Sequence, residues 1–201
     1  HVIFDNGTTD VVFGVSTIAG DLTVISGNAS GITDNGTVTV DGDVSLTTDA
    51  NSGVINMNQL VQTALAGNTL LLNTDGSGAA TIVNTQGVNL AGNTGIGGAA
   101  SITATTGTIT QTGALIVGGT GSFKTTTDDQ AITLDTSTNA ITGEVDFTTN
   151  TSAAPGSAGH VIFDNGTTDV VFGVSTIAGD LTVISGNASG ITDNGTVTVD
   201  G

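Results

Sequence analysis

The sequence predicts an all-β fold in which short strands stack as the coils of a parallel β-helix, or β-solenoid. Three observations favour this fold: the composition, a long internal repeat, and the alternation of apolar with polar residues. The 201 residues include one Lys, one Met, no Arg and 31 Gly, so several strong helix formers are scarce or absent. Thr, Val and Ile are abundant, and their branched side chains suit pleated strands.

A long internal repeat divides the chain. Residues 1–42 are identical to residues 160–201, so the sequence that starts at His1 starts again at His160. We therefore expect residues 1–159 to form one full repeat unit. Residues 160–201 then begin the next identical unit, within a longer array.

A weaker similarity lies inside the repeat unit. The segment that starts at Ile32, ITDNGTVTVDGDVSLTT, resembles the segment that starts at Ile109, ITQTGALIVGGTGSFKTT. This similarity predicts two diverged half-repeats. A finer period of about 20 residues fits both halves and predicts about eight coils per unit, because so short a repeat buries its apolar face only by stacking.

Apolar and polar residues alternate within the expected strands. Val38 and Val40 alternate with Thr37 and Thr39, and the same pattern recurs around Ile132. A period of two is typical of strands with one buried face and one solvated face. In a solenoid the inward residues of successive coils form apolar columns.

A string of tandem β-sandwich domains is the alternative fold. A half-repeat is close to the size of a small sandwich domain, and the Asn-Gly pairs at 6–7 and 35–36 suit hairpin turns as well as solenoid corners. Only six Phe are present, and residues 151–159, around Pro155, form the single linker-like stretch. Both observations favour the solenoid, because sandwich domains usually have bulky aromatic cores and clear linkers.

The charge excludes several functional classes. The net charge is −17, and the chain has a single Lys and no Arg that could neutralise phosphates, so we expect no nucleic-acid partner. No apolar run is long enough to span a bilayer, so we expect no membrane insertion of this segment. The chain starts at His1, and we expect any signal peptide to lie outside these residues.

Acidic residues are the candidates for metal binding. Asp5 and Asp10 flank the turn DNGTTD, Asp128 and Asp129 are adjacent, and Asp135 follows six residues later. Carboxylates at turns can hold Ca²⁺, a cation that prefers oxygen ligands. The alternative is that these are solvated turn residues, since Asp favours turns by bonding its own backbone. The glycine-rich nonapeptide of calcium β-rolls is absent.

No catalytic or cofactor-binding residue is predicted. Some β-helices are enzymes that cleave acidic polysaccharides, and these need basic groups beside their carboxylates. Lys124 is the only Lys or Arg in the chain, so this enzyme class is the least favoured and we expect no enzyme activity.

A family resemblance covers essentially the whole chain, at the level of a degenerate pattern. Residues 107–149, GTITQTGALIVGGTGSFKTTTDDQAITLDTSTNAITGEVDFTT, resemble the repeats of giant filamentous-haemagglutinin-type surface proteins of bacteria. The lead-in at 18–33, IAGDLTVISGNASGIT, is similar to theirs. The resemblance implies a right-handed parallel β-helix, secretion, and display on the cell surface or in an extracellular fibre.

These observations together predict a structural protein: the shaft of an extracellular bacterial fibre or giant surface adhesin. Its expected partners are further copies of itself, joined end to end or laterally. The alternative is an adhesin module that binds glycans or another cell surface.

Overall fold

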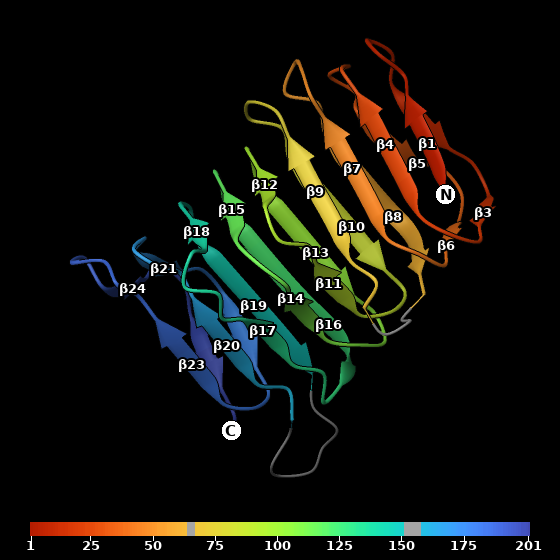
Figure 1. Ribbon diagram of the computed structural model, residues 1–201. Helices are drawn as coiled ribbons and strands as arrows, with labels where there is room; N and C mark the ends of the chain where they lie inside the picture. Colours follow the sequence, from red (N-terminus) through yellow and green to blue (C-terminus); the bar gives the residue numbers. More distant parts are fainter. Residues whose placement is uncertain (64–66, 151–157) are drawn as a thin grey trace.

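The computed structural model describes residues 1–63, 67–150 and 158–201. Its strands form two sheets, of 12 and 13 strands, and the described residues contain no helix. The coils follow one another along a single axis, with the two termini at opposite ends (Figure 1). The chain is therefore a β-solenoid, as the sequence predicts.

The first sheet consists of β1 (Val2–Asp5), β4 (Leu22–Ser26), β7 (Val44–Thr48), β9 (Leu70–Thr74), β11 (Val88–Leu90), β12 (Thr94–Ile96), β14 (Ile109–Gln111), β15 (Leu115–Val117), β17 (Ile132–Leu134), β18 (Ala140–Ile141), β20 (Val161–Asp164) and β23 (Leu181–Ile184). The second sheet consists of β2 (Val11–Phe13), β3 (Ser16–Ile18), β5 (Ile32–Asp34), β6 (Val38–Val40), β8 (Ile55–Gln62), β10 (Ala80–Asn84), β13 (Ala100–Ala104), β16 (Gly121–Asp128), β19 (Val145–Asn150), β21 (Val170–Phe172), β22 (Ser175–Ile177), β24 (Ile191–Asp193) and β25 (Val197–Val199).

Every strand pairing among the described residues is parallel. Parallel neighbours need a crossover connection, which here is the return path through the other sheet, whereas sandwich domains are built from antiparallel strands. The tandem-sandwich alternative is therefore wrong. Residues 151–157 of the linker-like stretch lie outside the described residues.

The coil count differs from the expected value. The path through the first sheet places seven strands before β20, and β20 is the copy of β1 in the next repeat. One unit therefore has seven coils and not about eight, and its average coil is longer than the sequence period predicts. The pairings show that coil length varies: the distance along the chain from Val2 to its partner Leu22 is shorter than the distance from Ile132 to its partner Val161. The prediction of about eight coils assumed one uniform period and did not include these longer connections.

The alternation within strands produces the buried core. In β4 the inward Leu22 and Val24 have no exposed surface, and neighbouring coils continue the columns with Val44 and Leu46. Burying one such side chain contributes about 1.5–3 kcal/mol, and each coil adds several. The two sheets therefore enclose one continuous apolar core along the axis.

The coils have two shapes. In the first coils, one strand crosses the first sheet while the second sheet has two short strands, as in β1 followed by β2 and β3. In the middle coils the first sheet has the two short strands, as in β14 and β15, and the second sheet has one long strand, β16. The first shape returns at β20, β21 and β22, so the repeat in sequence is also a repeat in coil shape.

The two Asn-Gly corners differ. Gly7 has φ 52° and its copy Gly166 has φ 57°, as expected for a corner that favours glycine. Gly36 does not have a positive φ, and a Cβ there would lie 2.7 Å from the backbone N of Val15. Close approach between coils, and not backbone conformation, requires glycine at the second corner.

Candidate functional site: the repeat junction and the coil edges

The junction between two repeats is the most informative site. Residues 160–180 of the second repeat stack on β17, β18 and β19 of the first, with Ile132 paired to Val161. The ring of Phe147 lies 5.3 Å from that of Phe163 and 6.2 Å from that of Phe172, centroid to centroid. Aromatic packing therefore continues the core across the boundary of the repeat.

A side-chain amide continues the hydrogen-bond ladder where the coil changes shape. Asn165 Oδ1 accepts a bond from Ile141 N at 2.8 Å, and Asn165 Nδ2 donates to Ile141 O at 3.0 Å. Asn165 is fully buried. Its amide thus takes the place of a peptide group beside β18, and it satisfies two backbone groups that burial would otherwise leave unpaired.

Two hydroxyl groups have the same role on the second sheet. Ser175 Oγ accepts a bond from Phe147 N at 3.0 Å, and Thr149 Oγ1 accepts one from Ala178 N at 3.0 Å. Both hydroxyl-bearing residues are buried. The junction is therefore held by backbone pairing, ring packing and specific side-chain bonds.

The same sequence is open at the start of the chain. We call the edge formed by β1, β2 and β3 the upstream edge. There Ile3 is 65%, Phe4 49% and Val12 53% exposed, whereas Phe163, the copy of Phe4, is fully buried. Because the residues are identical, stacking accounts for the difference.

The last coil of the given sequence shows the same contrast in exposure. We call the edge formed by β23, β24 and β25 the downstream edge. Ile191 is 50% and Val199 41% exposed, whereas their copies Ile32 and Val40, covered by the next coil, are fully buried.

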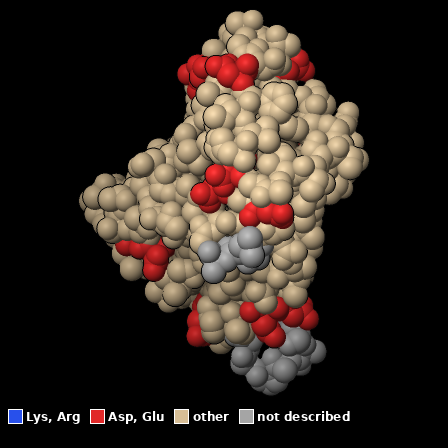
Figure 2. All heavy atoms as spheres, turned by 45° about the vertical axis from the view of Figure 1, so that its right-hand side comes forward, with Lys and Arg blue, Asp and Glu red and all other residues tan. Residues whose placement is uncertain are grey.

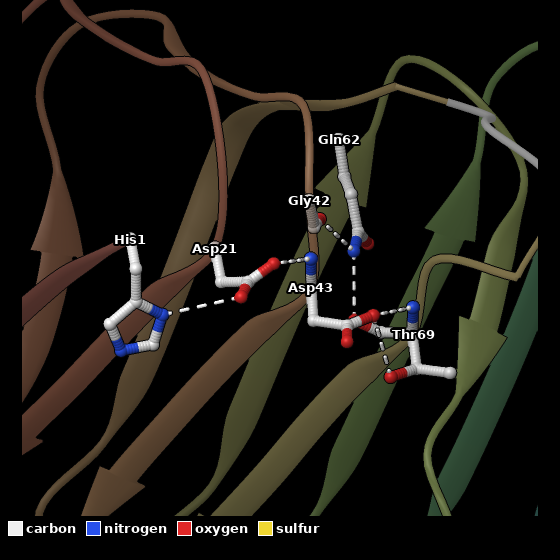
Figure 3. A network of polar contacts seen from close by, with 6 residues as sticks. All are labelled: His1, Asp21, Gly42, Asp43, Gln62 and Thr69. Atoms are coloured by element: carbon white, nitrogen blue, oxygen red, sulfur yellow. Dashed lines mark hydrogen bonds and ion pairs between the residues drawn. The ribbon is translucent and has the colours of Figure 1, made fainter.

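Carboxylates link successive coils (Figure 3). His1 Nδ1 lies 3.2 Å from Asp21 Oδ2, and Asp21 Oδ1 accepts a bond from Asp43 N in the next coil at 3.0 Å. Asp43 Oδ1 in turn accepts a bond from Thr69 N at 2.7 Å. Each carboxylate thus satisfies a backbone N–H of the coil that follows, in a charge-assisted bond.

A glutamine supports the same corner. Gln62 Nε2 donates to Gly42 O at 3.0 Å and to Thr69 O at 2.8 Å, so it ties two consecutive coils together (Figure 3). Its backbone N donates to Asn84 Oδ1 at 2.8 Å. Buried amides therefore recur as ladder elements along the solenoid.

Asp34 makes a further link of this kind on the second sheet. Its carboxylate accepts bonds from Asn58 N at 3.1 Å and Gln59 N at 2.8 Å, both in β8. Sequence reasoning missed Asp21, Asp34 and Asn165. A signal for the first was available, because Asp21 and Asp43 each directly precede a strand, one coil apart.

Two of the calcium candidates lie at the first corner. Asp5 is the last residue of β1, and its Oδ1 accepts a bond from Gly7 N at 3.1 Å. Asp10 precedes β2, and its backbone O accepts a bond from Asn6 Nδ2 at 2.8 Å. These contacts are those of turn residues that bond to their own local backbone.

The other three candidates lie in the sixth and seventh coils. Asp128 ends β16, Asp129 follows with φ 61°, and Asp135 follows β17. Within residues 1–63, 67–150 and 158–201, no three acidic or histidine side chains are grouped so that they could hold a metal ion. The structure therefore does not bring the five candidates into one cluster.

One carboxyl group has a shifted pKa. Burial, and secondly the negative charge of Glu144, raise the pKa of Asp146, while a hydrogen bond from the backbone of Val174 opposes the shift. Elsewhere carboxylates are spread over the surface in separate groups, as one face of the molecule shows (Figure 2). In the part of the chain that the structure describes, no helix could cross a membrane.

The fold and the junction define a parallel β-solenoid repeat protein. A family model described as repeats of unknown function (DUF5649) matches residues 2–76, 77–148 and 158–201, so the chain belongs to this family. The searches of curated proteins and of solved structures gave no match.

Proposed function

We propose that this chain is a segment of a structural shaft in an extracellular bacterial fibre or giant surface adhesin. One observation carries the proposal: the second repeat stacks on the first through both sheets, with Ile132 paired to Val161 and Val145 to Phe172. A protein built this way gains length with each repeat and needs no flexible linker.

The mechanical role follows from the ladder. Coils about 4.8 Å apart, seven to a unit, make each repeat add about 34 Å to a rod. Extension along the axis has to break the backbone bonds between coils, together with side-chain bonds such as those of Asn165. The net charge of −17 keeps neighbouring shafts apart in solution.

The proposal includes an extracellular location, further copies of the repeat as partners, and no catalytic role. A single Lys and no Arg support the last point, because sites that cleave acidic polysaccharides use basic groups. The resemblance of residues 107–149 to filamentous-haemagglutinin-type repeats supports the location.

The test is electron cryo-microscopy of the native material, with an antibody against the repeat to locate it on intact cells. We expect rods with an axial spacing of about 4.8 Å and a repeat of about 34 Å, labelled without lysis. Beads without the short spacing, or labelling only after lysis, would contradict the proposal.

A further inference from the structure

A pocket lies at a corner of the solenoid, within the first repeat unit. It is formed where the connection after β8 returns toward β9, beside the starts of β11 and β14, and its volume is about 180 Å³. Gln62, Thr63 and Asn68 line it from the connection, and Asn89 and Thr110 line it from the strands. Because β9, β11 and β14 are neighbours in the first sheet, successive coils build the pocket together.

Hydrogen bonds hold the lining in place. Asn68 Nδ2 donates to Asp41 O at 2.9 Å and to Thr63 O at 3.1 Å, so it closes the connection on itself. Asn89 Nδ2 donates to Asn68 O at 3.3 Å, and Thr110 Oγ1 donates to Asn89 Oδ1 at 3.3 Å. The lining is thus preorganised, which lowers the cost of binding a ligand.

Two glycines contribute to the hollow. A Cβ at Gly87 would lie 2.9 Å from Thr108 O, so the close approach of the coils excludes a side chain there. Gly67 has φ 102°, and no described atom lies within 4 Å of its Cβ position. Both glycines line the pocket. They leave backbone open to a ligand, which is a common role of glycine in binding sites.

Two polar groups of the lining have no partner among the described residues. Gln62 is 4% exposed, and its Nε2 donates to Gly42 O and Thr69 O (Figure 3), so its Oε1 remains as an acceptor. Thr63 Oγ1 is buried and has no hydrogen-bond partner in the part of the chain that the structure describes. Buried polar groups are normally paired, so two unpaired groups beside a pocket indicate a ligand that donates hydrogen bonds.

The lining is also neutral. No Asp, Glu, His, Lys or Arg is among the described residues that line the pocket, although the net charge of the chain is −17. An ion would lose its hydration there without gaining a partner of opposite charge, and the net charge repels anions. The volume is below the roughly 300–1,000 Å³ of pockets for drug-sized ligands. The ligand that fits is therefore small, neutral and rich in hydrogen-bonding groups.

We propose that this pocket binds a single neutral sugar residue, either free or at the end of a glycan. The hydroxyl groups of such a ring donate to Gln62 Oε1 and Thr63 Oγ1, and they accept from the hydroxyl of Thr108, which also lines the pocket. The binding does not depend on the proposed structural role. In an array of repeats the site recurs about every 34 Å, so a glycan-bearing surface is bound at many points.

The test is a titration of the 201-residue chain, labelled with nitrogen-15 and followed by NMR. The probes are D-glucose, D-galactose, D-mannose and N-acetyl-D-glucosamine, each as the free sugar and as its methyl glycosides. We expect at least one of them to shift the side-chain amide signals of Gln62, Asn68 and Asn89, and to saturate with a Kd of about 0.1–10 mM. No saturable shift with any of these sugars would overturn the inference.

Two comparisons between probes define the ligand further. Binding of a methyl glycoside as well as the free sugar places the ligand at the end of a glycan, whereas binding of the free sugar alone identifies a free sugar. D-Glucuronic acid should bind at least about tenfold more weakly than the best neutral sugar, because its carboxylate has no partner in the lining. Tighter binding of the acid would contradict a neutral site.

Variants locate the site. Thr110→Trp places a large ring at the pocket and should abolish the shifts. Its matched control is Thr23→Trp, because Thr23 is likewise an outward, half-buried threonine of the first sheet but lies in β4, and this variant should bind normally. Thr108→Val removes a hydroxyl that makes no hydrogen bond among the described residues, so it should keep the melting temperature and weaken binding about fivefold. Unchanged binding in both pocket variants would overturn the inference.

The outcome is separate from the test of the shaft. Rods with a repeat of about 34 Å and no sugar binding would leave the shaft proposal standing and remove this one. Sugar binding by a chain whose native material lacks that spacing would do the reverse.

Discussion

Phe4 and Phe163 occupy the same position of the repeat, yet Phe4 is 49% exposed and Phe163 is fully buried. The ring of Phe163 packs against that of Phe147 in the preceding coil. The ring of Phe4 packs against that of Phe13 in its own coil, with 6.0 Å between the ring centroids. Such pairs of identical residues provide internal controls, because local sequence is constant and only stacking differs.

The first prediction compares the two phenylalanines. Phe163→Ala should lower the free energy of unfolding by about 3–5 kcal/mol, because it leaves a cavity in the core. Phe4→Ala should cost about half of that or less, since half of the side chain is already in water. Urea denaturation of both variants measures the difference, and equal losses would contradict burial at the junction.

A second prediction concerns the buried amide at the junction. Asn165→Ala removes both bonds to Ile141 and should cost about 1–3 kcal/mol, because the peptide groups become buried and unpaired. The control is Asn6→Ala, because Asn6 is the copy of Asn165 in the first repeat. Asn6→Ala loses only the bond from Asn6 Nδ2 to Asp10 O, and Asn165 makes the equivalent bond to Asp169 O. The difference in stability between the variants therefore isolates the ladder bonds to Ile141. Hydrogen exchange should also be faster at Ile141 in Asn165→Ala alone.

The third prediction uses two identical glycines. Gly31 has φ 68° and a Cβ there would lie 1.8 Å from Val54 O, whereas Gly190 has φ 73° and nothing within 4 Å of its Cβ position. Gly190→Ala should cost about 1–2 kcal/mol from the left-handed conformation alone. Gly31→Ala should cost clearly more, because β5 must also move away from β8. Thermal melts measure the loss, and equal decreases in the melting temperatures of the two variants would contradict this contact.

The fourth prediction concerns pH. The pKa of Asp146 is raised in the folded state, so the native chain binds this proton more tightly than the unfolded chain. This carboxylate therefore disfavours folding at neutral pH, and the penalty disappears as pH falls through the raised pKa to the ordinary value. Asp146→Asn should raise the melting temperature slightly near pH 7 and have no such effect near pH 3.

Glu144→Gln is the companion to this measurement. It removes the nearby negative charge but leaves the burial of Asp146, so it should give a smaller gain near pH 7. A destabilised Asp146→Asn variant at neutral pH would show that the carboxylate is favourable in the fold.

Several features of the solenoid could be predicted from the sequence. The alternation of Val38 and Val40 with threonine identified the inward face of β6, which is buried as expected. The identity of residues 1–42 and 160–201 predicted that one unit would follow another. The coil count was overestimated, because connections such as the one between Ile132 and Val161 are longer than a uniform period allows. The calcium candidates were selected for turn composition, and turn composition alone does not bring carboxylates together.

The sequence by itself determined the class of fold, because strand alternation and repetition are local properties of the chain. Only the tertiary structure decided the seven coils of a unit and the change of coil shape within it. It also decided the roles of Asn165 and Asp34, since these depend on which backbone groups of a neighbouring coil lie beside them. The physical reason is that hydrogen bonds between coils join residues far apart in the chain, such as Ile141 and Asn165, and the lengths of the intervening connections set which residues meet.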